Sequence, residues 1–137
     1  MRLFVDTSTL FKKYIEEPGS AAFEDLLNGA AEIAVSPVTW IEMNAALERC
    51  REKRLVSPAD DEKIHAEIRT DFAYLMRVVW NEALEDLAVR LIRKHSLRTL
   101  DAVQLASWIL SEADLFVTSD EKLYREAKKA IRKAVLI

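Results

Sequence analysis

Two aspartates follow short apolar runs that have the pattern of buried strands. Asp6 comes directly after residues 3–5, and Asp120 comes shortly after residues 115–117. In an open parallel sheet, ligands bind beyond the carboxyl ends of the strands, and these ends meet at one edge. Both carboxylates are therefore expected near one site. Each aspartate also suits a simpler role, as the cap or first-turn acid of the helix that follows it.

Two further acids stand near the beginnings of expected helices. Glu42 lies about one turn into the helix after the second strand, and Thr39 with Glu42 matches a capping box, the favoured interpretation of Glu42 taken alone. Asp101 lies in the first turn of a helix that follows another helix, so the strand-end rule does not place it. From the residues alone, pairing with Arg98 is favoured. Asp114 precedes the fourth strand, belongs at the opposite edge and is given no role.

A cluster of carboxylates would need a cation, because crowded like charges repel one another. Ligand sets made of oxygen alone suit Mg²⁺ or Mn²⁺ rather than zinc. His65 and His95 lack the His-x-x-x-His spacing of zinc sites and are interpreted as surface or helix-end residues. Cys50, the single cysteine, cannot form an internal disulfide and is interpreted as a buried, inert thiol.

Other enzyme chemistries have weak support in this sequence. Two glycines cannot build a glycine-rich phosphate loop, and no Gly-x-Ser-x-Gly elbow occurs. A Ser–His–Asp triad has no local signature. Phosphotransfer with Asp6 as nucleophile, in the manner of haloacid-dehalogenase phosphatases, would require a second aspartate two residues later, where Ser8 stands.

The composition is that of a globular protein. The chain has 137 residues, of which 50% are hydrophobic and 31% charged, and we expect a single domain over residues 1–137. The formal net charge of −3 argues against a simple electrostatic nucleic-acid binder, but not against a nuclease whose acids bind cations. No run reaches the ~18 apolar residues of a membrane span, and Asp6 comes too early for a signal peptide. We expect a cytoplasmic protein with no membrane partner.

Short apolar runs alternate with helix-period segments along the whole chain. The runs are continuous, which favours strands buried on both faces of a parallel sheet. They cover residues 3–5, 33–35, 77–80, 115–117 and 134–137. Helices are expected over residues 20–27, after Ser36-Pro37, Ser57-Pro58, Asn81 and Thr99, and from about 120 to 132. This order predicts a three-layer α/β/α fold with a central parallel sheet of four to five strands.

Five segments resemble the motifs of PIN domains, in the order in which that family has them. They are Phe4 to Leu10, Glu16 to Ser20, Val38 to Glu42, Leu100 to Ala106 and Phe116 to Asp120. The first and fourth of these are quite specific, and together the motifs span nearly the whole chain. The length further resembles that of VapC-type toxins from bacterial and archaeal toxin–antitoxin pairs.

This resemblance implies a metal-dependent endoribonuclease that uses Mg²⁺ or Mn²⁺, forms a homodimer and is silenced by a small antitoxin. Carried over by motif, the acidic quartet is Asp6, Glu42, Asp101 and Asp120. Thr7 and Ser119 would be hydroxyls that orient carboxylates or water. Many relatives carry a further acid shortly after the fourth. Here Glu121 is adjacent and Lys122 follows, which puts a second, fully protein-held metal in doubt.

Several neighbouring residues complete this hypothesis. The cations Lys12, Lys13 and Arg98 could hold the phosphate backbone of RNA, although each could equally be solvated surface. An antitoxin would need an apolar groove, for which the candidates are Phe11, Tyr14, Trp40 and Met43, all of which could instead be core. The alternative function is a catalytically inactive PIN-like module that only binds a partner.

Overall fold

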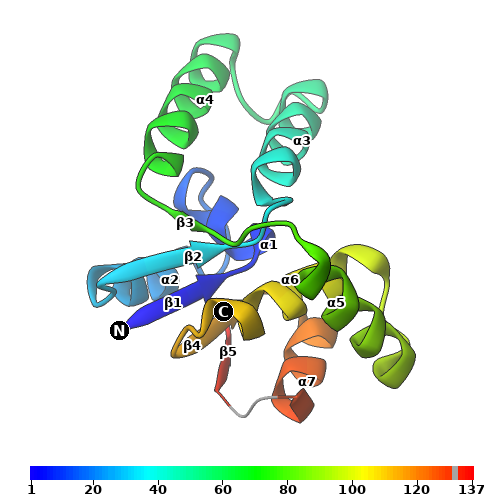
Figure 1. Ribbon diagram of the computed structural model, residues 1–137. Helices are drawn as coiled ribbons and strands as arrows, with labels where there is room; N and C mark the ends of the chain where they lie inside the picture. Colours follow the sequence, from blue (N-terminus) through cyan, green and yellow to red (C-terminus); the bar gives the residue numbers. More distant parts are fainter. Residues whose placement is uncertain (131–132) are drawn as a thin grey trace.

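The computed structural model describes residues 1–130 and 133–137. In these residues five parallel strands form one sheet in the order β3-β2-β1-β4-β5, as Figure 1 shows. The strands are β1 (Arg2–Val5), β2 (Glu32–Val35), β3 (Met76–Arg77), β4 (Leu115–Thr118) and β5 (Ala134–Leu136). They match the continuous apolar runs. The third strand is shorter than predicted, because Val79 and Trp80 lie beyond it and are exposed.

The register places the ends of β1 and β4 side by side. Val5 pairs with Val117, and the backbone N–H of Asp6 donates to the carbonyl of Val117 at 3.1 Å. The residues that follow β1 and β4 therefore leave the sheet at the same edge. Asp114 lies at the other edge, where its carboxylate accepts a hydrogen bond from the backbone N–H of Arg2, as the sequence predicted.

Helical segments connect the strands. They are α1 (Thr7–Leu10), η1 (Phe11–Lys13), α2 (Ser20–Asn28), α3 (Thr39–Glu52), α4 (Pro58–Phe72), α5 (Glu82–His95), α6 (Thr99–Ser111) and α7 (Glu121–Ala130). The predicted caps Ser57 and Asn81 are confirmed, since each side chain accepts the N–H three residues later. Thr99 is not a cap but the first residue of α6. The predicted end of the last helix, near residue 132, lies outside the described residues.

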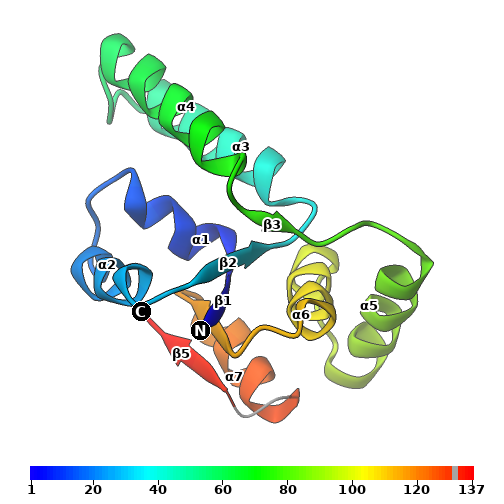
Figure 2. The same ribbon diagram turned by 60° about the vertical axis from the view of Figure 1, so that its left-hand side comes forward.

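The helices cover both faces of the sheet, and each face has its own core. Side chains alternate along a strand, so neighbouring residues enter opposite layers. Leu3 and Val5 pack with α1, α2, α3 and α4, whereas Phe4 packs with α5, α6 and α7. Both views show α3 and α4 as a pair of helices that extends away from the sheet (Figures 1 and 2). The predicted α/β/α architecture is confirmed.

An aromatic group fixes β1 and β4 from the α6 side. The rings of Phe4 and Phe116 stack with centroids 5.7 Å apart, and Trp108 of α6 packs against Phe116 at 4.9 Å. Such pairs contribute about 0.5–1.5 kcal/mol each beyond the burial of their area. This packing holds α6 against β1 and β4, the strands that lead into Asp6 and Asp120. Within the described residues, none of the helices has the length and hydropathy needed to cross a bilayer.

Candidate functional site

The four acids singled out in the sequence line one small cavity at the carboxyl edge of the sheet. The cavity has a volume of about 150 Å³. Its wall consists of Asp6, Thr7, Ser8, Glu42, Leu100, Asp101, Gln104, Asp120 and Leu123. The acids come from four different places in the fold: the end of β1, the first turn of α3, the first turn of α6 and the residue before α7. The structure thus brings together residues up to 114 positions apart in the sequence.

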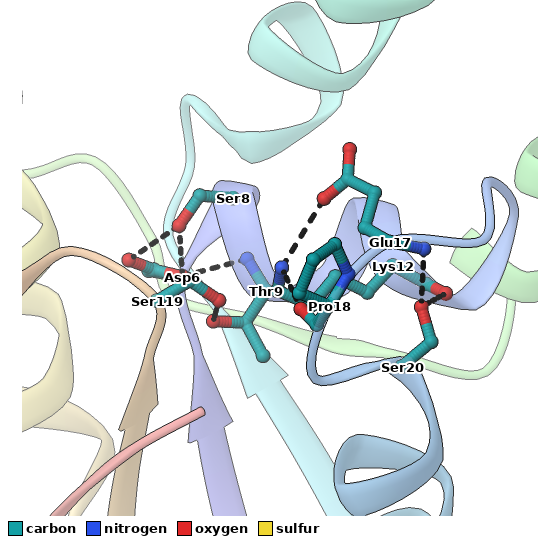
Figure 3. Close-up of polar contacts among 8 residues, drawn as sticks. All are labelled: Asp6, Ser8, Thr9, Lys12, Glu17, Pro18, Ser20 and Ser119. Carbon is teal, nitrogen blue, oxygen red and sulfur yellow. Dashed lines mark hydrogen bonds and ion pairs between the residues drawn. The ribbon is translucent and has the colours of Figure 1, made fainter.

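Asp6 is the most firmly held of the four. Its carboxylate is buried and accepts hydrogen bonds from the Thr9 N–H at 3.0 Å and the Ser8 hydroxyl at 3.0 Å (Figure 3). It also accepts one from the Thr118 hydroxyl at 2.5 Å. The bond from Thr9 caps α1, so the capping role considered for Asp6 is also formed. Burial raises the pKa of the Asp6 carboxyl above its ordinary value, and the hydrogen bonds oppose that rise.

Glu42 faces the cavity rather than the end of its own helix. Its Oε1 accepts hydrogen bonds from the Thr7 hydroxyl at 2.8 Å and from the side-chain amide of Gln104 at 2.9 Å. The capping box is not formed, because Thr39 is itself the first residue of α3 and its hydroxyl contacts that of Ser36 at 3.1 Å. The capping interpretation of Glu42 was therefore wrong.

Asp101 and Asp120 combine a local role with a place in the cavity wall. The carboxylate of Asp101 lies 3.7 Å from the guanidinium of Arg98, whose side chain is 78% exposed. Asp120 accepts the N–H of Leu123 at 3.0 Å and so stabilises the first turn of α7. The local roles considered for these two acids are both present, and they do not prevent either carboxylate from lining the cavity.

The two predicted hydroxyl residues differ in what they contact. Thr7 donates to Glu42 and accepts from Gln104 at 3.1 Å. The Ser119 hydroxyl shares a hydrogen bond with that of Thr9 at 2.8 Å (Figure 3), and in the described part of the chain it reaches no carboxylate directly. The hydroxyl that donates directly to Asp6 is that of the preceding residue, Thr118, and the role of Ser119 stays a prediction.

Thr118 and Gln104 were not singled out by the sequence analysis, although both stand within its motifs. Thr118 is the last residue of β4, beside the end of β1, and is completely buried. Gln104 follows Asp101 by three positions, which places both on one face of α6. It is 4% exposed, and its Oε1 is a buried oxygen to which no group in residues 1–130 and 133–137 donates a hydrogen bond. The i, i+3 spacing is the signal that could have identified Gln104.

The predicted phosphate-binding lysines are held by acids of their own. Lys12 donates to Glu17 at 3.2 Å and to the carbonyl of Pro18 at 2.8 Å, and its side chain is only 8% exposed (Figure 3). Lys13 pairs with Asp71 at 2.6 Å. Both lysines therefore stabilise the segment around η1, and Arg98 remains as the exposed cation beside the acids.

Most of the other residues named from the sequence are structural. Of the groove candidates, Phe11 and Met43 are buried in the core. Trp40 packs edge-on against Phe72, and the Tyr14 hydroxyl donates to Asp71 at 2.5 Å. His95 ends α5, as predicted, and its ring nitrogen lies 3.0 Å from Glu126. Cys50 is free and half-buried, not fully buried as predicted.

The donor set of the cavity fits a hard divalent cation, since its charged ligands are all carboxylates. Across residues 1–130 and 133–137, however, no three Asp, Glu, His or Cys side chains lie close enough together to hold a metal ion. The carboxylates of Asp6, Glu42 and Asp120 instead accept hydrogen bonds from the protein, and that of Asp101 lies beside Arg98. Like charges without a cation between them also repel one another. The four acids therefore line one cavity, but in the described residues their side chains do not form a ready metal-binding group.

A family model and several solved structures match this chain. The PIN-domain model matches residues 3–129. No curated protein matches the chain. The fold is similar to a toxin–antitoxin complex from Klebsiella pneumoniae, with a TM-score of 0.68, 18% identity and coverage of 98% of this chain and 96% of that one.

Two further structures share the fold. FitAcB from Neisseria gonorrhoeae has a TM-score of 0.70 and 12% identity, covering 98% of this chain and 96% of that one. VapBC2 from Rickettsia felis, bound to a DNA fragment from their promoter, has a TM-score of 0.69 and 13% identity, covering 100% and 99%. At such identities the likeness shows a common fold. Because the family model spans most of the sequence, this chain belongs to the PIN-domain family.

Proposed function

We propose that this protein is a metal-dependent endoribonuclease that hydrolyses phosphodiester bonds in RNA, and that it is the toxin of a VapBC-type toxin–antitoxin pair. The observation that carries the proposal is the cavity lined by Asp6, Glu42, Asp101 and Asp120, which come from four separate elements. Membership of a family of nucleases supports the reaction class. The toxin–antitoxin complexes among the similar structures support the biological role.

Asp6, Asp101 and Asp120 would hold Mg²⁺ or Mn²⁺, and Glu42 would bind it directly or through water. When bound, such a cation supplies Lewis-acid stabilisation of charge on the phosphate and makes a water molecule more acidic. The buried hydroxyl of Thr118 and the N–H of Thr9 hold Asp6 in one orientation. A carboxylate that is fixed in this way loses little freedom when it becomes a ligand.

Glu42 is suited to take a proton from the attacking water. Thr7 and Gln104 both bind its Oε1, and in the described residues Oε2 accepts no hydrogen bond. The free oxygen can receive the proton while the other two contacts keep the carboxylate in place. The chain's own contribution to hydrolysis is thus to orient Glu42 and to hold the acids around the scissile phosphate.

Two interactions with other chains belong to the same proposal. The protein would act in the cytoplasm as a homodimer, and a small antitoxin protein would inhibit it. Support for the antitoxin comes from the similar complexes, whose chains this protein covers almost end to end. Expression of the chain alone should arrest the growth of a bacterial host. The proposal expects a short reading frame beside the gene, and its co-expression should restore growth. An arrest that persists would rule out an antitoxin encoded there.

The nuclease is tested by incubating purified protein with a pool of structured RNA in Mn²⁺, in Mg²⁺ and in chelator. We expect discrete cleavage products that require the cation and disappear in Asp101→Asn. Asp114→Asn is the matched control, because it removes the same charge at the opposite edge of the sheet and should cleave like the wild type. The inactive-module alternative predicts no cleavage and no thermal stabilisation by Mn²⁺.

A further inference from the structure

A second cavity, of about 390 Å³, adjoins the cavity of the acids. Thr7, Ser8 and Glu42 line both of them. The remaining wall of the second cavity consists of Phe11, Glu17, Ala46, Arg49, Cys50, Lys53 and Leu55. The two cavities therefore lie next to each other, and an extended ligand whose reacting group lies among the acids has this space beside it along α3.

One face of α3 forms the floor of this path. Glu42, Ala46, Arg49 and Lys53 follow one another at intervals of four, three and four residues, which places them along one side of a helix. At a rise of 1.5 Å per residue, Arg49 lies about 10 Å along the axis from Glu42. The methyl group of Ala46 leaves room between the acid and the first cation.

The two cations of this face are not neutralised by the protein. Arg49 and Lys53 are exposed, and no ion pair or hydrogen bond in the described residues involves either side chain. Their neighbour Arg51, which points elsewhere on the same helix, is paired with Glu48. Glu17, the other acid of the second cavity, is already bound by Lys12. The cavity therefore presents two uncompensated positive charges next to a site that a polyanion must enter.

We propose that this cavity is a binding site for the sugar–phosphate backbone of single-stranded RNA beside the scissile bond, with Arg49 and Lys53 as its phosphate ligands. The inference rests on the nuclease function proposed above. A guanidinium can bind a phosphate through two hydrogen bonds, and a lysine contributes a point charge. Leu55, which is 69% exposed at the same cavity, provides an apolar surface for a base. An acidic peptide is the less suitable ligand, because its carboxylates would offer no reacting group to the adjoining acids.

Steady-state cleavage of a single-stranded RNA tests the role of the two cations. The double variant Arg49→Gln/Lys53→Gln should raise KM at least tenfold and change kcat by less than twofold. The slope of log binding constant against log salt should fall by about 1.4, since each phosphate contact with a single strand contributes about 0.7. Arg90→Gln/Arg93→Gln on α5 removes the same charge from the opposite face of the sheet. Equal effects of the two double variants would overturn the proposal.

Cys50 supplies a second readout that does not depend on cleavage. It is the single cysteine, it is half-buried, and it lines the same cavity. In an Asp101→Asn background, a single-stranded RNA oligonucleotide should slow alkylation of Cys50 by iodoacetamide at least fivefold. The protection should be lost when Arg49 and Lys53 are both replaced. Polyglutamate of equal charge should give no protection, and equal protection by it would overturn the assignment to RNA.

The two experiments separate failure of this site from failure of the nuclease. RNA cleavage with unchanged KM in the double variant, together with an unprotected Cys50, would leave the nuclease and remove the binding site. Protection of Cys50 that depends on both cations, in a protein that cleaves no RNA, would keep the binding site and remove the nuclease.

Discussion

The two sides of the acidic cavity are built differently. On the strand side, Asp6 is 4% exposed and is held by three donors, and Asp120 accepts the N–H of Leu123. On the helix side, the only partner of the Asp101 carboxylate among the described residues is an exposed arginine, at 3.7 Å. The strand-side acids therefore take part in folding as well as in the site. Asp101 of α6 can lose its charge at little cost in folding free energy. Its variants should therefore lose activity without losing stability, whereas variants of the strand-side acids should change both.

The largest expected effect is that of Asp101→Asn on cleavage. Replacement of residues that merely support a metal ligand costs 10- to 100-fold, so loss of a ligand should lower kcat on the order of 100-fold or more. The free energy of unfolding should change by less than about 1 kcal/mol, because an ion pair at 3.7 Å with a 78% exposed arginine contributes little. Single-turnover cleavage and urea unfolding measure the two quantities. A large loss of stability would show that both sides of the cavity support the fold.

Asp6→Asn should abolish cleavage to a similar extent but should alter stability. The folded-state pKa of Asp6 lies above its ordinary value, so the folded protein holds this proton more tightly than the unfolded chain does. Stability is then lost as pH rises from about 3.8 through the raised pKa. Asparagine keeps an acceptor for the Thr9 N–H and lacks the charge.

In metal-free buffer the Asp6→Asn variant should therefore be more stable than the wild type at neutral pH, and the advantage should disappear in acid. Urea unfolding in chelator between pH 4 and 8 measures this difference. Asp101→Asn serves as the comparison and should track the wild type throughout. An Asp6→Asn protein that is less stable at neutral pH would mean that its hydrogen bonds outweigh burial.

Gln104→Met should have an intermediate effect. The variant loses the donor to Glu42 and Thr7 but keeps a similar volume, so kcat should fall about tenfold. The free energy of unfolding should stay within about 1 kcal/mol, because the buried Oε1 of Gln104 already lacks a donor. Full activity in Gln104→Asn would contradict this role, since its shorter side chain keeps the amide but should not reach both Thr7 and Glu42.

The smallest expected effect is that of Ser119→Ala, and it should separate two neighbouring hydroxyls on the strand side. Thr118→Val removes a donor to Asp6 and should lower cleavage about tenfold. Ser119→Ala removes only a contact with the Thr9 hydroxyl and should change cleavage less than threefold. The reverse order in a cleavage assay would restore Ser119 to the role that the sequence suggested.

The sequence predicts the strand side of this cavity better than the helix side, for a physical reason. Apolar runs identify β1 and β4, and the geometry of parallel strands then places Asp6 and Asp120 at one edge. The position of α6 depends on packing of Trp108 and its neighbours against the sheet, which periodicity does not reveal. Asp101 was accordingly placed only by its resemblance to a family motif.

Side-chain contacts were the least predictable part. Thr39 and Glu42 have the spacing of a capping box, yet α3 begins one residue too early for that box to form, so that Thr39 is its first residue and not its cap. Gln104 reaches Glu42 from a helix 62 positions away, and a local pattern does not contain such a contact. The distances between the carboxylates likewise depend on contacts that form only in the folded chain.

The most direct measurement is a crystal structure of the protein grown with Mn²⁺, with data collected at a wavelength where manganese scatters anomalously. We expect an anomalous peak in the cavity between the two sides, within about 2.0–2.3 Å of carboxylate oxygens from Asp6, Asp101 and Asp120. The side chain of Asp101 should have turned away from Arg98 to reach it. A peak that contacts only one side of the cavity, or no peak there at saturating Mn²⁺, would contradict the central claim that both sides form one metal site.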